Sequence, residues 1–188
     1  MTLDQEIYNA AISEGYSPSS AKLIVAQARL ESANYSSAVF KKNNNLFGMK
    51  FVGQPLASRG SLAPVSERSD TCKAGGECKN SDHYAKYSSP TDSIKDLVGR
   101  LYKKERKGIG FNELRDVKDA DEFATKLKQR DYFGVSAGEY ALGLKARLLL
   151  VNVVAFYKKY EKPINYGLWG AILIGATAFA YWYYKRNK

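Results

Sequence analysis

The sequence has few of the side chains on which metal and thiol chemistry depend. Its 188 residues include one histidine, His83, and two cysteines, Cys72 and Cys78. No zinc-ligand spacing is present and no nucleophile pattern surrounds the histidine, so we expect no metal site and no cofactor, and a cysteine peptidase is disfavoured. The two cysteines flank "KAGGE", where they can close a disulfide hairpin in an oxidising space or remain two free thiols.

Negative charge is also scarce. The chain has 29 Lys and Arg against 19 Asp and Glu, a net charge of +10. Removing the three cations of the last four residues from +10 leaves +7 on residues 1–163. Basic proteins bind nucleic acid, anionic membrane surfaces or anionic polymers. No basic helix with interleaved base-reading residues occurs, so we do not expect nucleic acid as a partner.

One stretch of the chain lacks charge altogether. No charged residue occurs from Ile164 to Tyr184, a run of 21 positions with aromatic residues at both ends. This length predicts a single transmembrane helix at about 164–184, within a C-terminal segment 161–188 that begins with a hinge and ends in a basic tail. We therefore expect a single-pass membrane protein in contact with a lipid bilayer. Cations flank the run on both sides, so its orientation stays open.

Small residues recur at every fourth position of this run, at Gly167, Ala171 and Gly175. Such spacing allows close helix packing in a membrane, and a weak homo-oligomer is therefore an expectation. The first fifteen residues, "MTLDQEIYNAAISEG", have neither the charged region nor the apolar region of a secretory signal.

The remaining sequence predicts an α+β fold, mostly helical, in one domain over residues 1–160. Between the helices, residues 51–87 are punctuated by Gly and Pro and predict a loop-rich β-lobe with two or three short strands. Gly108 and Gly110 are expected to end the helix that begins at residue 89. The predicted helices are residues 2–14, 18–32, 37–42, 89–107, 119–130 and 137–160.

Glu31 stands out within "ARLESANYSSAVFKKNNNLFGMK", residues 28–50. It lies three residues after Ala28 and seven after Ile24, on the apolar face of the helix 18–32. Partial burial and the carbonyl end of a helix both disfavour the ionised carboxylate, so we expect a raised pKa. A carboxyl group that stays protonated can donate a proton to a leaving oxygen; the alternative from spacing alone is an exposed helix-end Glu.

These residues resemble the signature of the glucosaminidase-like glycoside hydrolases (family 73), which have a lysozyme-like fold. A Gln-Ala-x-x-Glu-Ser run appears here as residues 27–32, and an Asn-Asn-Leu-Phe-Gly-Met-Lys run as residues 44–50. The segments "YAKYSSPTDSIKDL" and "LKQRDYFGVSAGEYALGLKARL" also resemble family blocks, although Asp131 stands where the family usually has Gly. The likeness covers about residues 5–155 and leaves the uncharged run outside.

The resemblance implies a peptidoglycan hydrolase that cleaves β-1,4 glycosidic bonds of the glycan strand, as an endo-β-N-acetylglucosaminidase, with Glu31 as general acid. A muramidase or a lytic transglycosylase on the same fold remains open, and so does a non-catalytic glycan-binding protein of a virion. A membrane-anchored enzyme of this kind would suit a bacteriophage with a membrane in its particle, and the virion membrane or the host inner membrane is the location to test. A host-lysis or cell-division enzyme is the alternative.

The second carboxylate of the family comes from the β-lobe and varies. The candidates are Glu67, Asp70, Glu77 and Asp82. Glu67, on the predicted strand "APVSER", corresponds best to the family position. A water-activating base needs a gap of about 6.5–9.5 Å to the acid, whereas a nucleophile lies nearer, and assistance by the substrate's N-acetyl group needs no second carboxylate.

Tyr132 and Tyr140 match family tyrosines near the cleft, where a tyrosine can hydrogen-bond the N-acetyl group or stack on a sugar; the alternative is core packing, more so for Tyr140. Asn44 and Asn45 are expected to tie the β-lobe to the helices through their amides, and Asn45 is also a candidate for saccharide contact.

Overall fold

The computed structural model describes residues 1–160, and its side chains are described as far as Val151. Contacts divide the chain into Met1–Val153 and Val154–Lys188. The predicted transmembrane segment 164–184 lies outside the described residues. Within 1–160, no helix combines the length and the apolar character needed to cross a membrane.

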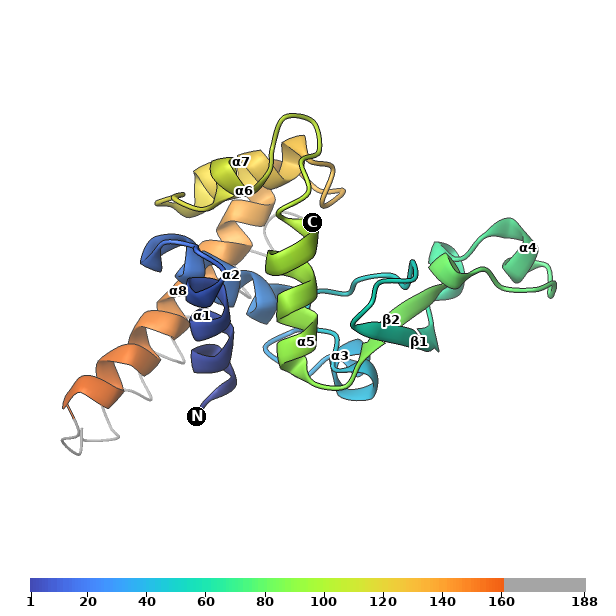
Figure 1. Ribbon diagram of the computed structural model, residues 1–188, viewed down its shortest axis with the longest axis horizontal. Helices are drawn as coiled ribbons and strands as arrows, with labels where there is room; N and C mark the ends of the chain where they lie inside the picture. The colour runs from blue at the N-terminus through green and yellow to red at the C-terminus, as the bar shows by residue number, and fades with distance from the viewer. Residues whose placement is uncertain (161–188) are drawn as a thin grey trace, which may run out of the picture. The chain divides into compact units, whose positions relative to one another are not determined.

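Helices form most of the described chain, and one small sheet accompanies them (Figure 1). The α-helices are α1 Leu3–Ser13, α2 Pro18–Glu31, α3 Ala38–Asn43, α4 Asp70–Lys73, α5 Pro90–Ile94, α6 Phe111–Leu114, α7 Ala120–Gln129 and α8 Ala137–Tyr160. Two 3-10 turns, η1 Val65–Glu67 and η2 Asn80–Asp82, and a π-helical segment, η3 Lys95–Leu101, complete the helical elements. Strands β1 Ala57–Leu62 and β2 His83–Tyr87 pair antiparallel. The expected α+β plan is confirmed for these residues.

The first two helices begin where local sequence signals predict. Thr2 caps α1, and Ser17 caps α2 by accepting from the Ser20 N–H, with Pro18 in the first helical position. Pro is favoured there because its missing N–H would have no helical partner. α2 is buried along most of its length, from Ser20 to Ala28 with the exception of Lys22. The buried α2 therefore holds Glu31, its last residue, in a fixed place.

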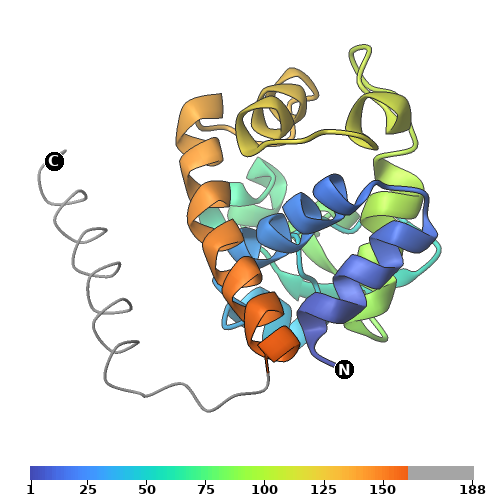
Figure 2. The same ribbon diagram turned by 90° about the vertical axis from the view of Figure 1, so that its left-hand side faces the viewer.

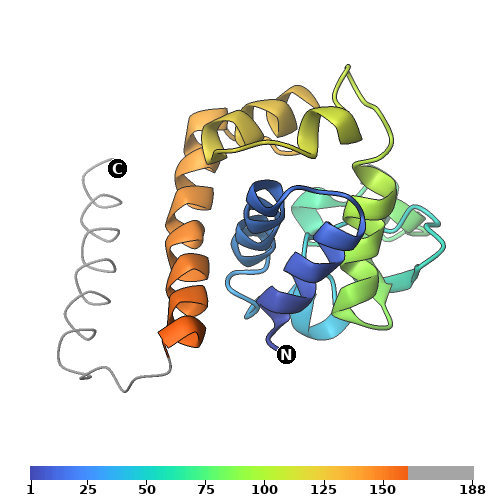
Figure 3. The same cartoon turned by 60° about the vertical axis from the view of Figure 1, so that its left-hand side comes forward.

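The hydrophobic core surrounds α2. Figures 2 and 3 show α6 and α7 as a layer over α1 and α2, with the first part of α8 alongside. Large side chains without exposed surface come from several elements: Ile7, Leu23, Ile24, Leu97, Tyr102, Phe123, Leu127 and Leu144. α8 packs closely on α2, since a Cβ at Gly143 would lie 3.0 Å from a methyl group of Leu30.

The β-lobe is joined to α3 by three consecutive asparagines. Asn43 exchanges hydrogen bonds with Ser61 of β1, and the Asn44 amide donates to the Tyr87 carbonyl. The buried Asn45 donates to the Met49 and Ala85 carbonyls and accepts from the Met49 N–H. The expectation that Asn44 and Asn45 tie the lobe to the helices is confirmed.

The expectation that Glu67 lies on a strand is wrong. β1 ends at Leu62, and residues 65–67 form the 3-10 turn η1, closed by hydrogen bonds from Glu67 N to Pro64 O and from Arg68 N to Val65 O. Pro64 has no N–H to donate to a ladder and its fixed φ favours a turn, which outweighs the alternation of "APVSER".

The helix expected over 89–107 is also shorter than predicted. It begins as predicted, with Ser89 capping α5, but its π-helical continuation ends at Leu101. The chain then makes a turn in which Arg106 and Ile109 pair, and Lys107 and Gly108 have positive φ. Tertiary contacts decide this end, because Tyr102 is fully buried and the Arg130 guanidinium binds the Leu101 carbonyl.

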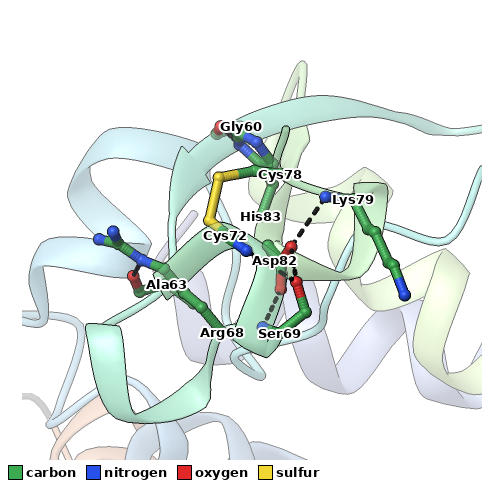
Figure 4. Close-up of a disulfide and its surroundings, with 9 residues drawn as sticks. All are labelled: Gly60, Ala63, Arg68, Ser69, Cys72, Cys78, Lys79, Asp82 and His83. Carbon is green, nitrogen blue, oxygen red and sulfur yellow. Dashed lines mark hydrogen bonds between the residues drawn. A yellow bond between two sulfur atoms is a disulfide. The ribbon is translucent and has the colours of Figure 1, made fainter. Parts of the chain in front are cut away.

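A disulfide joins Cys72 of α4 to Cys78, which resolves the alternative left open by the sequence (Figure 4). Next to it, Asp82 accepts from the Ser69 N–H, the Ser69 hydroxyl and the Lys79 N–H. These donors, with those of Ser69 first, hold the pKa of Asp82 below its usual value. The tip of the β-lobe is thus closed by one covalent link and one buried carboxylate.

We expect the double variant Cys72→Ser/Cys78→Ser to lose about 2 kcal/mol of unfolding free energy, because a short loop is no longer closed in the unfolded chain. Denaturant titration of both proteins measures the difference. Reducing the wild type should give the same loss, whereas reductant should not change the variant. Equal midpoints for oxidised wild type and variant would contradict the expectation.

Candidate active site

Glu31 lies at the point where the buried helix α2 meets a cleft. Its side chain is partly buried, and the next residue, Ser32, caps the helix and donates its hydroxyl to the Ala28 carbonyl. Ala33, Asn34 and Tyr35 then all have positive φ, so the chain turns sharply away from the helix. This conformation is uncommon for residues other than Gly and needs support from tertiary contacts.

A partly buried ion pair supports this turn. Asp4 of α1 receives the Arg29 guanidinium at 2.7 Å and the Tyr35 hydroxyl at 2.5 Å. Burial and the neighbouring Asp4 carboxylate raise the pKa of Tyr35, which therefore stays a neutral donor. No sequence pattern predicts this cluster, because its members are up to 31 positions apart and none matches a motif.

The carboxyl group of Glu31 has one hydrogen bond from a distant part of the chain. The Tyr140 hydroxyl of α8 donates to Oε1 at 2.6 Å. Burial raises the pKa of Glu31, and this hydrogen bond opposes part of the rise because it favours the ionised form. The expected raised pKa is confirmed, with burial as its first cause.

Removing the Tyr140 hydroxyl should move the pH profile of Glu31. In Tyr140→Phe the carboxylate loses a donor, so the Glu31 pKa rises further. If Glu31 acts as an acid, activity falls as pH rises through this pKa, and the alkaline limb of kcat in the variant should lie at higher pH. Initial rates across the pH range measure the limb. An unchanged limb, or one displaced to lower pH, would contradict the assignment.

The cleft beside Glu31 has a volume of about 610 Å³ and receives side chains from both lobes. Glu31 and the segment after α7 contribute one wall, and the β-lobe contributes Glu67 and Tyr84. Its lining residues are Glu31, Ser37, Val39, Phe47, Gly48, Met49, Glu67, Tyr84, Tyr132, Phe133 and Gly134. The two acidic residues selected from the sequence therefore face one cleft.

Glu67 has a different environment from Glu31. Its side chain is 47% exposed and forms an ion pair with Lys50 at 2.6 Å. The Tyr84 hydroxyl donates to the same carboxylate at 3.2 Å. Neither Lys50 nor Tyr84 was predicted from the sequence to act in the site, although Lys50 ends the Asn-Asn-Leu-Phe-Gly-Met-Lys run.

The other candidate carboxylates lie away from this cleft. Asp70 and Glu77 are exposed near the disulfide, and Asp70 pairs with Lys73 of its own helix. Asp82 is buried and its oxygens are occupied by Ser69 and Lys79. The side chains of Cys72, Cys78 and Asp82 approach within 4.8 Å of one another, but disulfide sulfurs and a carboxylate that already accepts three donors do not suit a metal ion.

The structure brings Tyr132 and Tyr140 together with Glu31, whereas Asn45 lies apart. Tyr132 lines the cleft, but its hydroxyl is buried and has no hydrogen-bond partner among the described residues. The buried Gln27 accepts a hydrogen bond from the Tyr102 hydroxyl through Oε1, whereas its Nε2 also has no partner among the described residues. Tyr140 is buried, and its ring stacks on the ring of Phe133 with 3.9 Å between the two ring centres. Asn45 is buried with its amide bound to the β-lobe backbone, so its contact with saccharide stays a prediction.

Asp131, the departure from the family pattern, has a structural explanation. Its φ is +55°, a left-handed conformation that Gly adopts without strain and that Asp tolerates better than most residues. Its carboxylate pairs with Arg106 and Lys107. The side chain thus contributes ion pairs at a position where the backbone favours glycine.

Known proteins share this fold. The catalytic domain of the autolysin Auto from Listeria monocytogenes is 21% identical, over 82% of each chain, with a TM-score of 0.54. A peptidoglycan hydrolase from Sphingomonas sp. A1 is 21% identical over 78% of this chain and 88% of its own, with a TM-score of 0.53. A type VI secretion effector–immunity complex from Pseudomonas protegens gives 16% identity and a TM-score of 0.50. These likenesses define a lysozyme-like fold.

The family follows from the sequence match. The glucosaminidase family, described as mannosyl-glycoprotein endo-beta-N-acetylglucosaminidase, matches residues 7–181, and the chain belongs to this family of glycoside hydrolases. The match extends beyond residue 155, so the expectation that the uncharged run lies wholly outside the likeness is wrong. No curated protein matches the chain significantly.

Proposed function

We propose that the protein hydrolyses β-1,4 glycosidic bonds in the glycan strand of peptidoglycan, with Glu31 as general acid and Glu67 as second carboxylate. One observation carries the proposal: two carboxyl groups with opposite surroundings line the same cleft. Glu31 is partly buried and its pKa is raised, whereas Glu67 is half exposed and paired with Lys50. Glycoside hydrolysis uses one protonated and one ionised carboxyl group.

The proposed steps assign one task to each group. Glu31 donates its proton to the glycosidic oxygen as the bond to the anomeric carbon breaks, and the Tyr140 hydrogen bond stabilises the resulting carboxylate. Glu67 either removes a proton from the water that attacks the anomeric carbon, or attacks that carbon itself. In the second case the Glu31 carboxylate then takes a proton from the water that hydrolyses the glycosyl ester, which frees Glu67 and restores the acid. Tyr132 and the neighbouring Phe133 lie on the cleft wall, where aromatic rings can pack on sugar faces.

The choice of peptidoglycan rests on charge and on the nature of the structural relatives. The net charge of +10 favours an anionic polymer. Two of the structures with this fold are a bacterial autolysin domain and a peptidoglycan hydrolase. We place the cut after N-acetylglucosamine, in keeping with the family description.

Mass spectrometry of the fragments released from purified peptidoglycan tests the proposal. We expect fragments with N-acetylglucosamine at the reducing end. Reducing-end muramic acid would identify a muramidase, and a 1,6-anhydro product would identify a lytic transglycosylase. Binding to the polymer without release of any fragment would refute catalysis and leave a glycan-binding protein.

We further propose that the full chain associates with lipid bilayers through residues 164–184. The support is the sequence itself, because 21 positions without charge are enough to span a bilayer core. In a vesicle flotation assay the full chain should rise with the lipid, whereas Leu173→Arg should not. Equal flotation by both proteins, or by neither, would contradict the proposal.

A further inference from the structure

Two side chains converge on a single oxygen of Glu67. The Lys50 ammonium lies 2.6 Å from Oε2, and the Tyr84 hydroxyl donates to the same atom at 3.2 Å. The other oxygen, Oε1, has no hydrogen-bond partner among residues 1–151, the part of the chain whose side chains the structure describes. Because both contacts involve one oxygen, the carboxylate is fixed in orientation while its second oxygen stays available.

Lys50 is itself held firmly by the sheet. Its backbone pairs with Tyr84 in a bridge, and the flanking residues extend this pairing: Ala85 N donates to Met49 O and Phe51 N donates to His83 O, each at 2.9 Å. The side chain of the buried Gln54 donates to the Lys50 carbonyl at 3.0 Å. The Lys50 ammonium also lies 4.3 Å from the centre of the Tyr84 ring, within range of a cation–π interaction.

Glu67, by contrast, has little support from its own element. The turn η1 is three residues long and none of them is buried. A half-exposed glutamate on such a turn has several accessible rotamers, and fixing one of them has an entropic cost. The contacts from Lys50 and Tyr84 restrict this freedom from the neighbouring strand, where the backbone is ordered.

We propose that Lys50 is a positioning residue that binds Oε2 of Glu67 and so presents Oε1 to the water or to the anomeric carbon. The proposal rests on the function proposed above, in which Glu67 is the second carboxylate. Lys50 touches neither the substrate nor the reacting atoms in this assignment. Tyr84 assists it as a neutral second donor, since burial raises the pKa of Tyr84 and keeps its hydroxyl protonated.

Steady-state kinetics of the full chain on purified peptidoglycan tests the proposal. Lys50→Met should lower kcat about 10- to 100-fold with KM within about twofold, because misplacement of a reacting group acts on the chemical step. Lys50→Arg, which retains the cation, should recover most of the loss. Tyr84→Phe should lower kcat less than Lys50→Met does. Lys86→Met removes an exposed lysine of the same lobe outside the catalytic cleft and should keep wild-type kinetics.

The outcomes separate this inference from the proposed function. Wild-type kcat in Lys50→Met, with Glu67→Gln inactive, would overturn the role of Lys50 and leave Glu67 as the second carboxylate. An active Glu67→Gln would overturn both. A rise in KM alone would reassign Lys50 to substrate binding and overturn positioning. Failure of Lys50→Arg to recover activity, when it melts at the wild-type temperature, would also count against the proposal.

Discussion

Replacing Glu31 with Gln is expected to lower the rate of glycan hydrolysis about 10³-fold, because proton donation by a positioned acid contributes about 10²- to 10⁴-fold to such reactions. The amide has the same shape and can still accept the Tyr140 hydrogen bond, but it has no proton of suitable acidity to give to the leaving oxygen. Release of soluble fragments from dye-labelled peptidoglycan measures the rate. Glu139→Gln, on the exposed first turn of α8, is the matched control and should remain fully active.

The same variant should fold more stably than the wild type at neutral pH. The pKa of Glu31 is higher in the folded protein than in the unfolded chain, so folding favours the protonated form. The stability of the wild type therefore falls as pH rises from the unfolded pKa through the folded one, whereas Glu31→Gln has no such loss. Denaturant titration at pH values below and above this window should show a growing advantage of the variant. In the activity test described above, equal rates of peptidoglycan hydrolysis by the wild type and by Glu31→Gln would show that Glu31 is not the acid.

Arg130→Met is expected to lower the unfolding free energy by about 3 kcal/mol, because buried acceptors left unpaired cost about 1–3 kcal/mol each. The Arg130 side chain is 4% exposed and its guanidinium donates to the carbonyls of Leu101, Lys104 and Ile109. Leu101 is the last residue of η3, and Lys104 and Ile109 lie in the turn that follows it. Methionine fills similar space but donates no hydrogen bond, so the turn loses its partners.

The control for this change is Arg115→Met, which removes an exposed guanidinium paired with the adjacent Asp116. Its effect should stay within about 0.5 kcal/mol, as is usual for surface sites. Thermal or denaturant unfolding of the two variants provides the comparison. Equal stabilities would show that the three carbonyls find other partners in Arg130→Met and that the guanidinium does not hold the turn.

Local sequence signals predicted the elements in which local physics dominates. α2 begins at a Ser-Pro pair and carries an apolar stripe, and both features determine the helix without reference to the rest of the chain. The raised pKa of Glu31 followed from its place on that stripe. Asn44 and Asn45 were correctly interpreted as links to the β-lobe, since amides after a helix end commonly bind nearby backbone.

Predictions failed where distant contacts or a proline overruled the pattern. "APVSER" alternates like a strand, but Pro64 cannot donate to a ladder and the segment forms η1. The predicted helix continues beyond Leu101, yet the buried Tyr102 and the hydrogen bond from the Arg130 guanidinium to the Leu101 carbonyl fix its end there. No local signal in residues 89–107 reports a guanidinium 29 positions further along the chain.

The sequence by itself determined where most helices begin, the family, and the choice of Glu31 as the candidate acid, because helix starts and family motifs depend on residue types at fixed short spacings. Only the tertiary structure decided the partners of that acid. Tyr140 is 109 positions from Glu31, and Glu67 and Lys50 meet through the pairing of a loop with β2. Periodicity specifies which face of an element is buried, whereas the packing of separate elements decides which two polar groups meet across a cleft.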